Sequence, residues 1–199
     1  MTYGESVWPK KETTTRRFDT TADMSRHIVG QINKYVGEDD ILFHLGDWSF
    51  SGIENIWNFR KQLNVKTIHL LLGNHDHHIK RNRVLPNVYR TEPYSQVLAD
   101  GKPIGGEYPD YVEAKTLFAS VYEYLDVEID NVLVPLIHYP MENWNDRFGK
   151  AYHLHGHTHG MLPVKEFRLD VGMDNAFILF GEYRPFSWEE IKTILNDKK

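Results

Sequence analysis

The segment Leu71-Leu72-Gly73-Asn74-His75-Asp76 ends an apolar run that starts at residue 67, and three polar side chains follow its glycine directly. The run has the length and composition of a buried strand, and glycine is a usual breaker at the end of one. Polar groups placed there lie at the edge of a sheet, where open α/β folds form their sites. Taken alone, the segment is equally compatible with an ordinary polar turn.

Three other segments repeat this pattern of an apolar run that ends in polar side chains. They are residues 41–47, residues 136–140 and residues 152–159. Together the four segments place Asp, Asn and His at the ends of separate strands. Such oxygen and nitrogen groups bind borderline divalent metals without thiolate. The combination therefore predicts a metal centre, which no single segment does.

In their order along the chain, these segments resemble four of the five sequence blocks of the calcineurin-like metallophosphoesterases. The small bacterial and phage members are the most similar, and the resemblance covers nearly the whole chain. Gly-Asn-His-Asp and Gly-His-x-His are highly specific as a pair. The matching blocks are Gly46-Asp47, Gly73-Asn74-His75-Asp76, His138 and Gly156-His157-Thr158-His159.

The resemblance implies an α/β fold, a two-sheet mixed β-sandwich flanked by helices, and a metal-dependent phosphoesterase that hydrolyses phosphomonoesters or phosphodiesters. Asp47 would bridge two divalent ions about 3.5–4 Å apart, so that they share a hydroxide nucleophile. Asn74, His138 and His157 would complete the coordination of one ion, and His159 would bind the other. The family favours Mn, and Fe, Zn, Ni, Co or Mg are the alternatives for such ligands.

The resemblance also implies two catalytic residues. His75 matches the histidine that donates a proton to the leaving oxygen or neutralises its charge. Asp76 would orient the His75 ring, as carboxylates do for imidazoles generally.

Residues 141–150 form a polar and aromatic loop between two of the ligand segments. Trp144 and Arg147 in this loop are therefore candidates for binding the substrate at the rim of the site. A loop that is merely anchored by a buried tryptophan is an equally good interpretation.

The family's fifth block, an Asp-x-His pair on a first strand, has no match in residues 1–18. We interpret residues 1–199 as a single metallophosphoesterase domain that is N-terminally truncated relative to the family; a true loss of the first strand is the other interpretation. With the four matching blocks alone, a catalytically impaired module could hold one ion and bind a phosphorylated ligand or a protein partner. A sensor of phosphate-containing ligands without turnover is a third hypothesis.

Composition limits the partners. The 23 Lys and Arg against 28 Asp and Glu give no basic field for nucleic acid or an anionic membrane surface, so nucleic acid enters only as a candidate substrate. No apolar run is long enough to span a bilayer, and no membrane partner is expected. The absence of cysteine excludes disulfides and thiolate zinc sites. We predict a cytoplasmic protein that acts on a phosphoester substrate.

The first half of the chain predicts alternating helices and strands. Thr20 and Asp23 have the pattern of a helix cap, and apolar residues then recur at helical spacing until Gly37. A strand over residues 41–45 and a helix over residues 53–63 lead to the strand that ends at Leu72. This order predicts parallel pairing, with helices on the sheet.

The second half predicts a variable loop or lid over residues 94–111, and then mostly strands. Residues 122–129 and 132–138 are predicted to form a hairpin around Asp130-Asn131, and residues 167–171 to form a further strand. Ser187 opens a C-terminal helix with a capping-box pattern. Four further histidines inside strand-like runs are predicted to be packed or hydrogen-bonded rather than catalytic: His44, His69, His153 and His155.

Overall fold

The computed structural model describes residues 16, 18–49, 53–85 and 112–196. Within these residues the first sheet has the strand order β1-β2-β5, and all its strands are parallel. The strands are β1 (Ile41–His44), β2 (Thr67–Leu71) and β5 (Ser120–Tyr122). The predicted parallel pairing of the first two strands is confirmed.

The second sheet has the order β6-β7-β8-β9 and is mixed. β6 and β7 form an antiparallel hairpin, whereas β7, β8 and β9 run parallel. The strands are β6 (Tyr124–Ile129), β7 (Val132–Ile137), β8 (His153–His155) and β9 (Arg168–Asp170). Asp130 and Asn131 have φ values of 51° and 61°, which are typical of the tight turn predicted for this hairpin.

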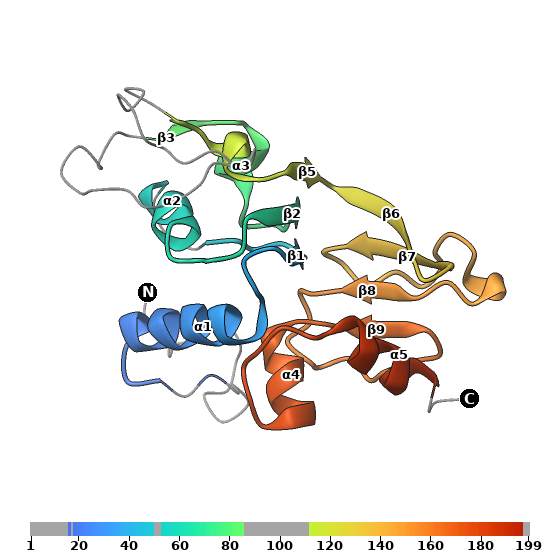
Figure 1. Cartoon of the computed structure of the whole chain (residues 1–199). Helices are drawn as coiled ribbons and strands as arrows, with labels where there is room; N and C mark the ends of the chain where they lie inside the picture. Colours follow the sequence, from blue (N-terminus) through green and yellow to red (C-terminus); the bar gives the residue numbers. More distant parts are fainter. Residues whose placement is uncertain (1–15, 17, 50–52, 86–111, 197–199) are drawn as a thin grey trace.

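Helices flank both sheets, as Figure 1 shows. The first sheet is accompanied by α1 (Thr21–Tyr35), α2 (Glu54–Arg60), the short α3 (His77–Lys80) and the 3₁₀ turn η2 (Ala114–Leu117). The second is accompanied by the 3₁₀ turn η3 (Arg147–Gly149), α4 (Met173–Phe180) and α5 (Trp188–Asn196). A small ribbon of β3 (Val84–Leu85) and β4 (Val112–Glu113) completes the described elements.

Both predicted helix caps are present. Thr20 Oγ1 accepts a hydrogen bond from the Asp23 amide at 3.1 Å at the start of α1. Before α5, the Ser187 amide donates to Glu190 at 2.9 Å, and Ser187 Oγ accepts from the Glu190 amide at 3.3 Å. This reciprocal pair is a capping box.

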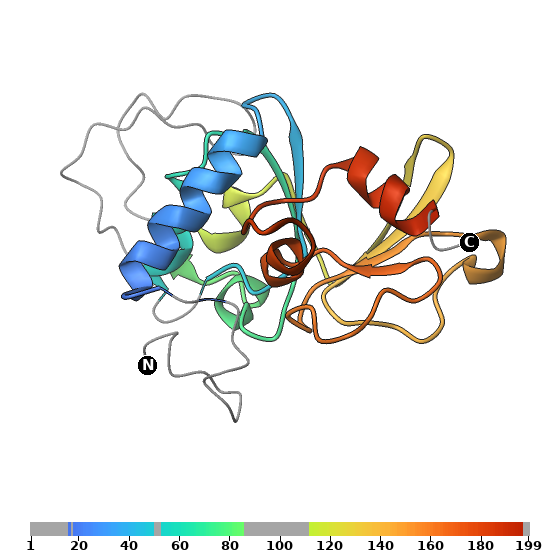
Figure 2. The same cartoon turned by 90° about the horizontal axis from the view of Figure 1, so that it is seen from below.

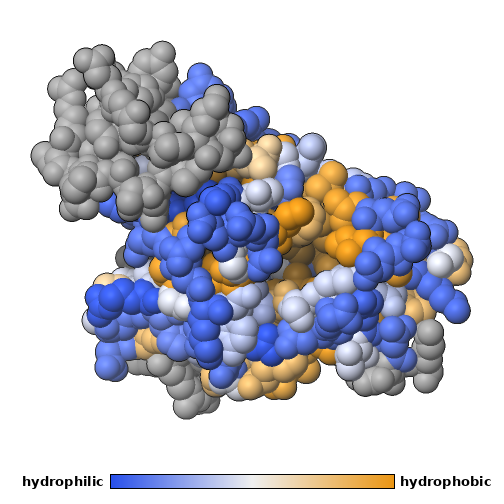
Figure 3. All heavy atoms as spheres, in the orientation of Figure 1, coloured by the Kyte–Doolittle hydropathy of each residue, from blue (hydrophilic) through white to orange (hydrophobic). Residues whose placement is uncertain are grey.

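β2 is buried on both faces because its side chains alternate between two apolar clusters. Ile68 and Leu70 pack with α1, α2 and η2 in one cluster, while Leu71 packs with β7, β8, β9 and α5 in the other. A strand covered on both sides has a continuous apolar sequence, which is the pattern of residues 67–72. Figure 3 shows hydrophobic residues in a hollow between the two halves of this face.

The α/β class and the pair of sheets flanked by helices are therefore confirmed. One detail is corrected: the predicted strand over residues 122–129 is divided at Glu123, where the chain passes from the first sheet into the second. The predicted loop over residues 94–111 lies outside the described residues. In the described part of the chain, no helix has the length and apolar character needed to cross a membrane.

Candidate metal centre

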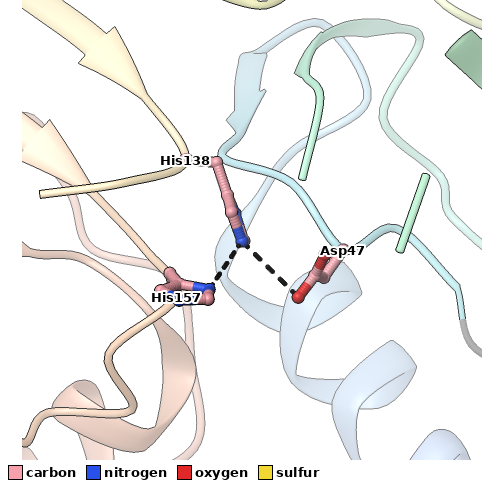
Figure 4. A group of neighbouring side chains, drawn as sticks. All are labelled: Asp47, His138 and His157. Carbon is pink, nitrogen blue, oxygen red and sulfur yellow. Dashed lines mark hydrogen bonds and ion pairs between the residues drawn. The ribbon is translucent and has the colours of Figure 1, made fainter. Parts of the chain in front are cut away.

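Three polar side chains converge on His138 Nε2. This atom lies 3.1 Å from Asn74 Oδ1, 3.1 Å from His157 Nδ1 and 3.5 Å from Asp47 Oδ2. In the described part of the chain, the ligand atoms of Asp47, His138 and His157 lie within 4.8 Å of one another (Figure 4). The sequence predicted these four residues as one ligand set, and the structure brings them together.

The convergence follows from the topology. Asp47 and Asn74 come after β1 and β2, which are parallel neighbours in the first sheet. His138 and His157 come after β7 and β8, which are parallel neighbours in the second sheet. All four side chains therefore lie beyond carboxyl ends of strands, where α/β sheets commonly place ligands. The Gly156 amide also donates to the His138 carbonyl at 3.1 Å, which joins the two loops of the second sheet.

The hydrogen bond on the other side of the His138 ring indicates its tautomer. His138 Nδ1 lies 2.7 Å from the carbonyl oxygen of Leu45, and a carbonyl only accepts. Nδ1 therefore carries a proton, and in the neutral ring Nε2 presents a lone pair. This lone pair faces the oxygens of Asp47 and Asn74, which are acceptors too. A cation at this point would satisfy all of them together.

Asp47 is held in an uncommon backbone conformation that directs its carboxylate. Its φ is 55°, in the left-handed region, which is uncommon for residues other than glycine. Oδ1 accepts a hydrogen bond from the His75 amide at 3.0 Å, which leaves Oδ2 toward His138. The loop after β2 thus orients the ligand that follows β1, and it brings His75 beside the centre.

Gly73 makes this contact between loops possible. A Cβ at position 73 would overlap the Asp47 carboxylate and amide, and it would come within 2.9 Å of His138 Cε1. Only glycine allows the backbone after β2 to approach two ligands so closely.

Asp76 fastens the two loops of the first sheet together. Its carboxylate accepts hydrogen bonds from the amides of Asp47, Trp48 and Gly73, each at 2.8 Å. The side chain is buried, and this burial raises the pKa of Asp76 although the three amide bonds oppose the shift. These contacts make Asp76 a support for Asp47. Its predicted role in orienting the His75 ring stays a prediction.

The loop after β8 carries the remaining predicted ligand. His157 and His159 have φ values of 66° and 52°, and burial lowers the pKa of His157, with nearby His138, His159 and His75 contributing. His159 follows His157 by two residues in the same loop. Its Nδ1 is 2.7 Å from Asp174 Oδ2. A role for His159 at a second ion stays a prediction.

Asp170 supports this loop, and the sequence analysis did not identify it. The carboxylate accepts from the amides of Gly160 and Gly172 at 2.9 and 2.7 Å, and from Thr158 Oγ1 at 2.5 Å. It is only 3% exposed, although it belongs to an apolar strand segment. A charged residue between Leu169 and Val171 was the one sequence signal that could have identified it.

Trp144 and Arg147 lie at the other end of the second sheet. The Trp144 indole donates to the Ala151 carbonyl at 2.9 Å, and the next amide, of Tyr152, pairs with Leu133 at the start of β7. His138 follows the opposite end of that strand. The Arg147 guanidinium binds within its own loop and to Glu166, at 2.9 Å. These contacts fit the anchored loop better than the substrate rim.

The four histidines predicted to be structural have structural surroundings. His69 Nδ1 lies 2.6 Å from Ser120 Oγ, and His153 Nε2 accepts from the Met141 amide at 2.9 Å. Burial lowers the pKa of His44 and of His153 to about 4 each, and it lowers that of His155 as well. These imidazoles are neutral parts of the protein interior at neutral pH.

Comparisons with known proteins add information on the fold alone. No family model and no curated protein matches the chain. Among solved structures, it is similar to AQ665 from Aquifex aeolicus, a protein of unknown function, with 19% sequence identity and a TM-score of 0.54. The similarity covers 89% of this chain and 87% of that one. An arrangement like this one has therefore been observed in a crystal structure.

Proposed function

We propose that the chain is a metal-dependent phosphoesterase of the calcineurin-like type, which hydrolyses phosphomonoesters or phosphodiesters. The observation that carries the proposal is the convergence of metal-ligating atoms from Asp47, Asn74, His138 and His157 on one point. The sequence blocks that carry these residues resemble those of the family. The geometry and the sequence pattern thus both support the same four side chains.

The donor set is chemically suited to the proposed cofactor. One carboxylate, one amide oxygen and two imidazole nitrogens, without thiolate, suit Mn, Fe, Zn, Co or Ni. Asp47, Asn74, His138 and His157 would hold the first ion. A bound ion would polarise a phosphoryl oxygen and lower the pKa of a water molecule. His159 and Asp47 would bind a second ion. In the family, the remaining ligands of that ion come from an Asp-x-His pair, which has no match in residues 1–18.

The other residues around the centre would act on the substrate or on the ligands. The His75 amide binds Asp47, so this residue lies beside the centre, and its imidazole would protonate the leaving oxygen. Asp76 would keep the loops after β1 and β2 at a fixed separation, through its three amide hydrogen bonds. Positioning of this kind contributes to catalysis by keeping the ligands preorganised.

Elemental analysis of the full chain, paired with hydrolysis of an aryl phosphodiester in Mn²⁺, tests the proposal. We expect bound metal and turnover in the wild type, and loss of both in Asp47→Asn. His75→Ala should retain metal while turnover falls by about 10²–10⁴-fold, the usual contribution of a general acid. His77→Ala is the matched control, because this histidine is exposed and only two residues away.

The outcomes separate the enzyme from its alternative. One ion per chain without turnover would contradict the enzyme and favour a binding module that uses the first ligand set alone. Loss of metal in His75→Ala would contradict the role assigned to that residue.

A further inference from the structure

Asp174 makes contacts that the family's residue roles do not include. It lies in the first turn of α4, its side chain is 4% exposed, and Oδ2 lies 2.7 Å from His159 Nδ1. An ionised carboxylate only accepts, so Nδ1 carries the proton and Nε2 of the neutral ring keeps its lone pair. We propose that Asp174 is a positioning residue that fixes the tautomer and direction of the His159 ring, so that Nε2 faces the metal centre.

This inference rests on the proposed function, because it assigns His159 Nε2 to a metal ion. A histidine that binds a metal usually donates its other ring N–H to a carboxylate or carbonyl, which fixes the ring and makes it a better ligand. His138 already shows the same arrangement, with Nδ1 on the Leu45 carbonyl and Nε2 in the centre. His159 with Asp174 repeats the first half of it, two residues after His157.

The backbone fixes His159 relative to Asp174. Gly160 packs so closely on α4 that a Cβ there would lie 2.5 Å from Ile178 Cδ1 and 3.2 Å from Asn175 Cα. The Gly160 amide and the Asn175 side chain are both bound to Asp170, at 2.9 and 2.6 Å. The loop and the first turn of α4 are therefore one packed unit, and α4 lies between the two halves of the molecule (Figure 2).

Arg16 compensates the buried charge of Asp174. Its Nε lies 2.9 and 3.0 Å from the two carboxylate oxygens, and a second guanidinium nitrogen lies 2.6 Å from Oδ2. A buried carboxylate without a cation would be costly, and an arginine that binds both oxygens offsets much of that cost. Arg16 thus allows a charged acceptor to remain behind His159.

Asp174→Ala should release the His159 tautomer and weaken metal binding. A lost outer-shell partner typically costs about 10–100-fold in metal affinity. Asp174→Asn keeps an acceptor oxygen without the charge, so it should retain the tautomer with an intermediate affinity. Arg16→Gln should leave the tautomer unchanged, because the hydrogen bond from Nδ1 remains.

The experiment is nitrogen-15 NMR of the imidazoles in the metal-free full chain, at a pH well above the usual histidine pKa, followed by titration with Mn²⁺ alone. Thermal unfolding of each variant confirms that it is folded. Asp23→Ala is the matched control, since Asp23 lies in the first turn of α1 and is remote in sequence from the site. It should change stability without changing the His159 tautomer.

The two proposals fail differently in this experiment. A His159 tautomer that is the same in Asp174→Ala as in the wild type overturns the positioning role. An equal loss of Mn²⁺ affinity in Asp23→Ala and Asp174→Ala also overturns it, because the effect would then be one of stability. A wild-type chain that shows the expected tautomer and binds no Mn²⁺ overturns the proposed function instead.

Discussion

Two buried carboxylates hold the two halves of the candidate metal centre, and they act over different lengths of chain. Asp76 accepts hydrogen bonds from the amides of Trp48 and Asp47, which are 28 and 29 residues away in the sequence. It therefore connects the segment after β1 to its own loop after β2. Asp170 binds groups no more than 12 residues away, in the loop after β8 and in the turn after its own strand, β9. Both side chains are 3% exposed. The first half of the centre therefore depends on assembly of distant segments, whereas the second is mainly local.

Because the first half depends on distant segments, the largest effect should come from disturbing the contact between its two loops. Gly73→Ala places a Cβ against the Asp47 carboxylate and His138, and neither ligand can move without losing the centre. We expect loss of metal binding and a lower melting temperature, measured by elemental analysis and calorimetry.

Gly30→Ala is the control for this glycine substitution. Gly30 lies in α1, and a Cβ added to it would meet only open space, so alanine should stabilise the helix by about 0.5–1 kcal/mol. Normal metal content in Gly73→Ala would contradict the close packing of the two loops.

The topology of the ligand set could be predicted from the sequence, whereas its supports could not. Asp47, Asn74, His138 and His157 each follow an apolar run, and parallel strands bring such ends together. Asp174 has no comparable signal, because its partner Arg16 is 158 residues away and the pair forms only when the chain has folded.

The strand boundary at Glu123 was also not predictable. Tyr122 and Tyr124 have similar strand propensity and lie on either side of it, so local sequence predicts one continuous strand. Tertiary pairing divides the run, because Tyr122 pairs with Leu71 in the first sheet and Tyr124 with Ile137 in the second.

Replacing each carboxylate by its amide compares the two halves directly. Asp76→Asn and Asp170→Asn both turn one acceptor into a donor that faces backbone amides, which typically costs about 1–3 kcal/mol of stability. We expect Asp76→Asn to lower Mn²⁺ affinity more, because it separates Asp47 from Asn74. Calorimetric titration of both variants measures the difference. A larger loss in Asp170→Asn would reverse the comparison.

Each half also contains a buried neutral histidine that should respond to acid. Burial lowers the pKa of His44 in β1 and of His153 in β8 from 6.5 to about 4. The unfolded chain then binds more protons than the folded one between these values, so stability should fall as the pH decreases from 6.5 toward 4. Each pKa unit corresponds to at most about 1.4 kcal/mol.

The two histidines differ in the hydrogen bonds that would be lost if each were replaced. Among the described residues, His44 Nδ1 has no hydrogen-bond partner, whereas His153 Nε2 accepts from the Met141 amide. His44→Phe should therefore reduce the loss of stability in acid at little cost at neutral pH. His153→Phe should destabilise the protein at neutral pH as well. Urea unfolding at several pH values distinguishes the two, and equal curves for both variants would contradict the assignment.

The smallest effect is expected at Arg147, outside both halves. Its ion pair with Glu166, whose side chain is 50% exposed, lies at the surface and should contribute no more than about 1 kcal/mol. Arg147→Ala should leave metal content and the Michaelis constant for an aryl phosphodiester unchanged, because the loop that holds it returns to the start of β7, away from His138. A raised Michaelis constant at normal metal content would restore the substrate-rim interpretation. It would also mean that the substrate extends along the second sheet, beyond the four ligands at its edge.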